Sequence, residues 1–237
     1  MSVKFFIKGW LSAVSPVTVC ALCKQPSLGP VCEWCKNDTQ FFYADAQPLN
    51  LLLRPAIARH LRHTGYSLLL ACGYYAWPFD EMVSRFKFNG DMRLATILGQ
   101  WLAQSCSQLP TAMQPELLLP VPLRTTGYWQ RQFNQAEVLA SVLGRELSIP
   151  VYRQWARRRR GLSQHRLNRS ARFTNLRQAF SISELPNVTR VAIVDDVVTT
   201  GCTADALANL LRRAHPHLQI QVWALAVTPA PGKKAKV

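Results

Sequence analysis

The sequence Val191-Ala-Ile-Val-Asp-Asp-Val-Val-Thr-Thr-Gly-Cys-Thr203 begins with four apolar residues and runs directly into two acids. The apolar residues predict a buried parallel strand from Arg190 to Val194, and the segment from Thr203 to Ala214 predicts a helix. Gly201 allows a tight turn between them, because glycine adopts backbone conformations that other residues avoid. Strand, turn and helix together indicate an α/β fold whose ligands bind at the carboxyl ends of the strands.

The polar residues of this segment suit a phosphorylated sugar. Asp195 and Asp196 follow the predicted strand, where carboxylates can accept hydrogen bonds from ribose hydroxyls or hold Mg²⁺. The turn after them offers backbone N–H groups, hydroxyls and a positive helix end to a phosphate monoester. The residues of this turn are Thr199, Thr200, Gly201, Cys202 and Thr203. The alternative is that the acid pair only caps a helix, as acids often do in α/β proteins.

Strands and helices alternate through most of the remaining chain. A basic amphipathic helix is expected over 49–65, ahead of the main domain. The predicted strands are Leu68–Ala76, Leu117–Pro122 and Ile220–Val227, and the predicted helices are Phe79–Phe88, Arg93–Ser107 and Phe133–Leu147. Such alternation is typical of a parallel sheet with helices on both faces. The predicted fold class is α/β, a doubly wound parallel sheet formed by residues 66–228.

Two cysteine pairs lie in residues 16–48, a segment with four prolines and one glycine. Cys20-x-x-Cys23 and Cys32-x-x-Cys35 supply four thiolates in the spacing of a tetrahedral structural zinc site. Four sulfur ligands leave no open position for catalysis at such a metal. The alternatives are a redox pair or unligated thiols. The segment therefore predicts a small module whose core is a metal ion.

Composition narrows the class of protein and its partners. The chain has 237 residues, 49% of them hydrophobic, a formal net charge of +15 and a pI near 10.0. A surface this basic attracts anions, whether nucleic acid, phosphorylated metabolites or anionic lipid. Metal-type spacing among the seven cysteines favours a reducing, cytoplasmic location. The sequence shows neither a signal peptide nor an apolar run long enough for a membrane span.

The acid pair with its Thr-Thr-Gly-x-Thr turn resembles the phosphoribosyl-diphosphate (PRPP) signature of type I phosphoribosyltransferases. Three shorter motifs accompany it, Lys87-Phe-Asn-Gly-Asp91, Pro120-Val-Pro-Leu-Arg124 and Phe133-Asn-Gln-Ala136. A further stretch contains Gln164-x-x-Leu167, Arg172-x-x-Asn175 and Ala179-Phe180. Their order, behind the four cysteines, is similar to that of the ComF/GntX family of competence-related proteins. The resemblance covers nearly everything from Cys20 to Val227. One departure is Ala171, because the family commonly has an acid at this position, directly before the arginine that is Arg172 here.

The resemblance implies roles for individual residues. Asp195 and Asp196 would form the catalytic centre and contact the ribose hydroxyls with Mg²⁺, and Thr199 to Thr203 would surround the 5′-phosphate. Leu123 and Arg124 would belong to the diphosphate-binding loop, although an ordinary turn after a strand is the alternative. Lys87 would reach the same pocket, unless it only complements the dipole at a helix end.

The resemblance also implies a role in competence or in the use of external DNA as a nutrient. One reading is an enzyme that transfers a phosphoribosyl group from PRPP to an unknown acceptor. The other is a protein without catalysis that binds nucleic acid or senses PRPP, in contact with single-stranded DNA or DNA-uptake proteins. Thr199 stands where purine-salvage relatives commonly carry an acid as a base, so no general base for an acceptor is evident.

An arginine-rich segment precedes the acid pair. Residues 153–177 contain nine arginines, and no Asp or Glu occurs between Glu146 and Glu184. Arg157, Arg158, Arg159 and Arg160 are suited to bidentate phosphate contacts. The segment is expected either to cover bound PRPP or to follow a nucleic-acid backbone, with Trp155 and Phe173 as stacking platforms. The remaining alternative is a basic surface loop without a ligand.

Overall fold

The computed structural model describes residues 18–44, 47–123, 133–158 and 179–230. The chain divides into two compact units, Met1–Thr39 and Gln40–Val237. The stretch after Thr39, which the sequence places with the cysteines, belongs to the larger unit. There the Phe41 ring packs edge-on against Phe79 and Trp101, at centroid distances of 6.0 and 5.0 Å.

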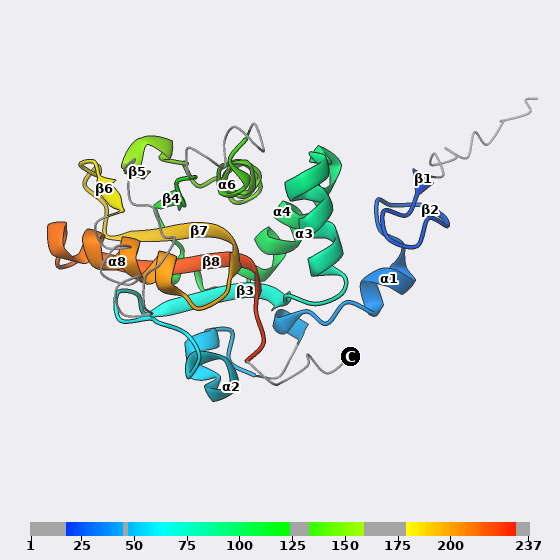
Figure 1. The fold of residues 1–237 in the computed structure, drawn as a ribbon, viewed down its shortest axis with the longest axis horizontal. Coiled ribbons are helices and arrows are strands. Elements are labelled where there is room, and N and C mark those ends of the chain that lie inside the picture. The colour runs from blue at the N-terminus through cyan, green and yellow to red at the C-terminus, as the bar shows by residue number, and fades with distance from the viewer. Residues whose placement is uncertain (1–17, 45–46, 124–132, 159–178, 231–237) are drawn as a thin grey trace, which may run out of the picture. The chain divides into compact units, whose positions relative to one another are not determined.

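A four-stranded parallel sheet organises the larger unit (Figure 1). Its order is β3 (Leu68–Tyr74), β8 (Gln219–Val227), β7 (Arg190–Val198) and β4 (Leu117–Pro120). All three pairings are parallel, and the apolar runs of the strands are buried, whereas β7 is only partly buried at its first residue and around its acid pair. The topology confirms the predicted α/β sheet.

Helices cover both faces of this sheet. α4 (Met92–Cys106) and α6 (Gln135–Leu147) pack on each other and on the sheet, with α3 (Phe79–Asn89) beside α4. α8 (Cys202–Ala214) covers the opposite face. Its Leu207 joins a buried cluster that takes alternate residues of β8, Ile220, Val222 and Ala224. Alternation is expected, because successive strand residues point to opposite faces.

The remaining elements are short. β5 (Ala156–Arg158) and β6 (Phe180–Ile182) form an antiparallel pair, and unit Met1–Thr39 contains β1 (Thr18–Val19), β2 (Pro26–Ser27) and α1 (Glu33–Asn37). Single turns of 3₁₀ helix occur at Phe42–Ala44, Leu51–Leu53, Thr111–Met113 and Arg153–Trp155. In the described part of the chain, every helix is too short or too polar to cross a membrane.

Two predicted elements differ in the structure. The helix expected over 49–65 is wrong, since only Leu51–Leu53 and α2 (Pro55–Ala58) are helical. Arg54 is extended, with φ −98° and ψ 102°. The cause is Pro55, because a proline disfavours the helical conformation of the residue before it. β7 is also longer than predicted and continues through both acids to Val198, which pairs with Val227 of β8.

Candidate functional site

The acid pair lies inside β7 and its two members have different surroundings. Asp195 is opposite Ala224 of β8. The two carboxylates are close enough for the charge of Asp196 to raise the pKa of Asp195, but they have different partners. Asp195 lines a hollow with the loop that follows the strand. Asp196 instead forms an ion pair with Lys87, in which Nζ lies 2.7 Å from Oδ2.

The hollow beside Asp195 is formed by residues 197–204 and opens to solvent. Its lining is mainly polar, so it suits a hydrogen-bonding group such as the phosphate of a sugar phosphate. All five residues of the predicted turn, Thr199 to Thr203, line this hollow.

Gly201 shapes the loop. Its φ of 71° is left-handed, and α8 starts at the next residue. The first helical N–H groups have no partner within a helix, so they are available to an anion at this end of α8. A Cβ on Gly201 would lie 2.5 Å from the Arg62 carbonyl oxygen. Glycine is thus required both by the backbone conformation and by the close approach of another segment.

Residues 62–66 form that second segment and support the loop from outside. The Arg62 N–H donates to the Thr200 carbonyl at 2.9 Å. The buried Asp205 carboxylate accepts hydrogen bonds from the Thr64 hydroxyl and from the Gly65 N–H, at 3.0 and 2.9 Å. Sequence reasoning missed Thr64, Gly65 and Asp205. The only sequence signal is an acid in the first turn of α8, which is also an ordinary helix-start preference.

Electrostatics also separate the two acids. Burial and the neighbouring Asp196 carboxylate raise the pKa of Asp195 to about 7. The Asp196 N–H, 2.9 Å from Asp195 Oδ1, and the Lys87 ammonium oppose this rise because they favour the charged form. Asp195 is therefore a carboxyl group that loses its charge easily, so a cation bound beside it would stabilise the ionised state.

The loop after β4 starts next to the acid pair. The Val121 N–H donates to the Val194 carbonyl at 2.9 Å, one residue before Asp195. The Asn134 side chain, which caps α6, donates to the Val121 carbonyl at 3.1 Å. Leu123, the last described residue of this loop, is partly buried. Arg124 lies outside the described residues.

The arginine-rich segment is described only at its ends. Arg157 is exposed on β5, whereas the Arg158 guanidinium lies over the Phe180 ring, 5.0 Å from its centroid. Arg159 and Arg160, like Phe173, lie outside the described residues. The prediction that Trp155 is a stacking platform is wrong. Its side chain is fully buried, and its Nε1 donates to the Pro120 carbonyl at 2.8 Å, so no base can reach the ring.

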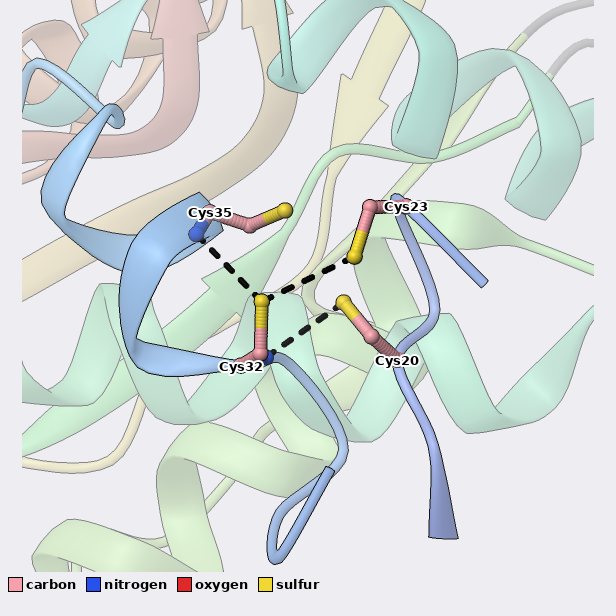
Figure 2. A group of neighbouring side chains, drawn as sticks. All are labelled: Cys20, Cys23, Cys32 and Cys35. Carbon is pink, nitrogen blue, oxygen red and sulfur yellow. Dashed lines mark hydrogen bonds between the residues drawn. The ribbon is translucent and has the colours of Figure 1, made fainter. Parts of the chain in front are cut away.

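A second candidate site is the four-cysteine cluster of the smaller unit. The Sγ atoms of Cys20, Cys23, Cys32 and Cys35 all lie within 4.8 Å of one another, and Figure 2 shows them converging from the two Cys-x-x-Cys turns. The Cys23 and Cys32 sulfurs are 3.7 Å apart. Two sulfurs bound 2.3 Å from a tetrahedral ion would be about 3.8 Å apart. The geometry thus suits four sulfur ligands around one metal ion.

Hydrogen bonds within this cluster stabilise the thiolate of Cys20, which is the form of cysteine that binds a metal. Burial disfavours the Cys20 thiolate, but N–H donors of Cys32, Cys23 and Leu22 outweigh burial and lower its pKa to about 6. The Cys32 N–H to Cys20 Sγ distance is 3.3 Å. Burial and the neighbouring sulfurs raise the pKa of Cys35 to about 12. A bound metal would relieve this, since it deprotonates a coordinating thiol.

Comparisons with known proteins match the chain to relatives that are named as competence and DNA utilization proteins. Competence protein F of Haemophilus influenzae is 32% identical over 216 residues, which cover 88% of this chain and 90% of that protein. DNA utilization protein YhgH of Escherichia coli K12 is 32% identical over 229 residues, 89% of this chain and 97% of that protein. Competence protein ComFC of Streptococcus pneumoniae is 26% identical over 140 residues, 59% of this chain and 60% of that protein.

Two further comparisons add little. No protein-family model matches the chain. Among solved structures, a purine phosphoribosyltransferase from Pyrococcus horikoshii Ot3 has a TM-score of 0.31 and 16% identity, covering 70% of this chain and 97% of that chain. A TM-score this low carries no argument, so the fold assignment rests on the sheet described above.

The described residues define an α/β protein with a parallel sheet, an acid pair and a glycine-started helix at the end of one strand, and a smaller unit whose four clustered cysteines suit a metal ion. Within this class, the two relatives at 32% identity match the chain over most of its length and of their own. The chain belongs to the ComF family, which confirms the resemblance seen in the motifs.

Proposed function

We propose that this chain binds PRPP, or another ribose 5-phosphate compound, with Mg²⁺ at the end of β7, and that it acts in DNA uptake or in the use of external DNA. The names of the relatives support the second part, since they are a competence protein and a DNA utilization protein. The observation that carries the first part is one hollow, lined by both Asp195 and the loop that starts α8.

The two ends of that hollow suit the two ends of a ribose 5-phosphate. N–H groups at the start of α8 and the Thr199, Thr200 and Thr203 hydroxyls favour the phosphate. Asp195 would accept hydrogen bonds from ribose hydroxyls. Carboxylate oxygens are the ligands that Mg²⁺ prefers, so Asp195 and Asp196 fit the ion, which would neutralise charge on a diphosphate. Leu123 and Arg124 are proposed to lie along the diphosphate.

The first prediction tests this pocket by titration calorimetry. Wild-type protein is expected to bind PRPP with Mg²⁺, and Asp195→Asn with Asp196→Asn is expected to weaken binding about 100-fold or more. Two charged hydrogen-bonding groups, worth roughly 1.5–3 kcal/mol each, are lost from the ligand. The fold should survive, because Asn keeps the size of Asp and a side-chain oxygen that can still accept a hydrogen bond from Lys87, and a raised pKa means that ionised Asp195 does not favour the folded state.

The matched control for this double variant is Asp80→Asn with Glu81→Gln. These two exposed acids are adjacent in the first turn of α3, so the change in net charge is the same. PRPP affinity should remain at the wild-type value in the control. Equal affinity in the two double variants would rule out the acid pair as the ligand site.

Turnover is a separate question from binding. Asp195 is the one carboxylate among the described residues that line the hollow, and Thr199 offers no base. We propose that the chain binds PRPP whether it is an enzyme or a sensor. Pyrophosphate release, measured in a screen of acceptors from free bases to ammonia, distinguishes the two, because only an enzyme releases it.

We also propose that the four cysteines hold one structural zinc ion. Zinc is the usual ion of closed four-thiolate sites, and the four sulfurs lie within 4.8 Å of one another, with those of Cys23 and Cys32 3.7 Å apart, close to the tetrahedral spacing. The ion would act on folding only, because four protein ligands leave no position for a substrate.

Arg157 and its neighbours are proposed to contact PRPP rather than DNA. Since Arg158 packs on Phe180, the useful variant replaces Arg157, Arg159 and Arg160 with Gln and keeps Arg158. PRPP affinity is expected to fall about tenfold or more, the loss of one or two charge-assisted contacts. Binding of a single-stranded oligonucleotide at physiological salt should stay negligible in both proteins.

The control for this triple variant removes three other positive charges by changing Arg93, Arg145 and Arg213 to Gln. These arginines are exposed and make at most surface ion pairs, which contribute little. The opposite result would be tight DNA binding by wild type, with log affinity falling by roughly 0.7 per contacted phosphate per log unit of salt. If only the triple variant at Arg157 loses such binding, the segment is a nucleic-acid site.

A further inference from the structure

The ion pair between Lys87 and Asp196 is not explained by the pocket alone. Lys87 lies in the last turn of α3, and its Nζ is 2.7 Å from Asp196 Oδ2. Both side chains are largely shielded, with 17% and 16% of their surface exposed. A lysine that only complemented the dipole of its own helix would have no need of this partner.

The second oxygen of Asp196 is also engaged. The Val197 N–H donates to Asp196 Oδ1 at 2.6 Å. One oxygen therefore holds a backbone donor and the other holds an ammonium group. An Mg²⁺ ion binds oxygen at about 2.0–2.1 Å, so it would meet the Lys87 ammonium at close range if it bound Asp196 Oδ2. Two cations at such a distance repel each other strongly.

We propose that Lys87 is a specificity-determining residue, which blocks the metal position of Asp196 in the empty protein and moves to the diphosphate when Mg²⁺ and PRPP arrive together. The inference rests on the proposed function for its PRPP arm. Lysine suits this exchange because its ammonium is a compact charge on a flexible stem. The anionic diphosphate supplies the partner that Lys87 needs once it leaves Asp196.

The exchange has a functional consequence. Free metal would have to displace Lys87 into solvent without compensation, and PRPP without metal would leave Lys87 on Asp196. Only the metal–diphosphate pair provides both a cation for Asp196 and an anion for Lys87. The pocket would thus select the metal complex of PRPP over free metal, free PRPP and ribose 5-phosphate.

The experiment compares wild type with Lys87→Met, both loaded with zinc in the cysteine cluster. The probe for the metal alone is Mn²⁺, followed by electron paramagnetic resonance in the absence of any sugar phosphate. We expect Lys87→Met to bind Mn²⁺ about tenfold more tightly, because a cation next to a ligand oxygen is removed. A residue that only supported the fold would weaken the site when replaced, so an unchanged or weaker Mn²⁺ affinity overturns the proposal.

The sugar-phosphate arm uses calorimetry with Mg²⁺ present. Lys87→Met should bind PRPP about tenfold more weakly, and its affinity for ribose 5-phosphate, which has no diphosphate, should stay within about twofold of wild type. Equal losses for both ligands contradict the diphosphate contact. If wild type binds neither sugar phosphate, the proposed function fails, while the Mn²⁺ measurement still decides the role of the ion pair.

Two further variants test whether the gain in Mn²⁺ affinity comes from removing Lys87 from Asp196. Arg85→Met removes a cation from the same helix, but Arg85 pairs with Glu81 and Asp91, so Mn²⁺ affinity should not change. Adding Asp196→Asn to Lys87→Met should abolish the gain in Mn²⁺ affinity, because the oxygen that Lys87 blocked is gone. A gain that persists in the double variant would mean that the metal binds elsewhere.

Discussion

Cys32→Ser is expected to abolish metal binding by the smaller unit and to unfold residues 18–39, while the parallel sheet stays folded. The unit has almost no core besides its sulfurs, since Leu22 and Val31 are its buried aliphatic residues in the described part of the chain. Trp34 and Leu28 are 82% and 79% exposed. A structural zinc ion contributes about 10–16 kcal/mol to such modules, so its loss outweighs every other interaction in the unit.

Serine at position 32 isolates the role of the metal. Cys32 is the N-cap of α1, and its sulfur accepts the Cys35 N–H at 3.5 Å. Serine is a preferred N-cap residue, so the substitution keeps the cap and removes only the ligand. Elemental analysis and amide hydrogen exchange give the two readouts, and Cys106→Ala, a buried cysteine of the larger unit, is the control. Wild type without zinc, together with protected amides in Cys32→Ser, would refute the module.

The sheet was predictable because most of its strands can be recognised from their own residues. Runs such as Leu117 to Pro120 are buried on both faces and so are continuously apolar. The extension of β7 through Asp195 and Asp196 was not predictable from these residues, since Asp disfavours strands. Pairing with β8 overrides that preference, and the register shows it, with Asp195 opposite Ala224.

The candidate site was predictable only where its residues are neighbours in the sequence. The turn from Thr199 to Thr203 is local, and its residues do line one hollow. The support from Thr64 to Asp205 spans 141 residues, and no local pattern reports such a contact. The prediction for Trp155 was wrong for the same reason. An aromatic residue among arginines is typical of a nucleic-acid surface, and the local sequence does not report that its ring is buried with the Pro120 carbonyl as partner.

The second large effect is expected for Gly201→Ala. Its φ of 71° costs an alanine about 1–2 kcal/mol, and the new Cβ would lie 2.5 Å from the Arg62 carbonyl oxygen. Backbone must then move, at a further cost of about 1–3 kcal/mol. The Arg62 segment also holds Thr200 through the Arg62 N–H, so the shift displaces the loop that is proposed to bind phosphate. PRPP affinity should fall at least about tenfold.

Gly90→Ala separates strain from displacement. Gly90 has a similar φ of 64°, but a Cβ there would meet nothing within 4 Å. Its cost should therefore be the conformational term alone, about 1–2 kcal/mol by urea denaturation, with ribose 5-phosphate binding unchanged. Gly201→Ala should lower the free energy of unfolding more than Gly90→Ala does, and it should also weaken the binding of ribose 5-phosphate. If the two alanine variants are equally stable and bind equally well, the close packing of residues 62–66 on the loop does not position the phosphate site.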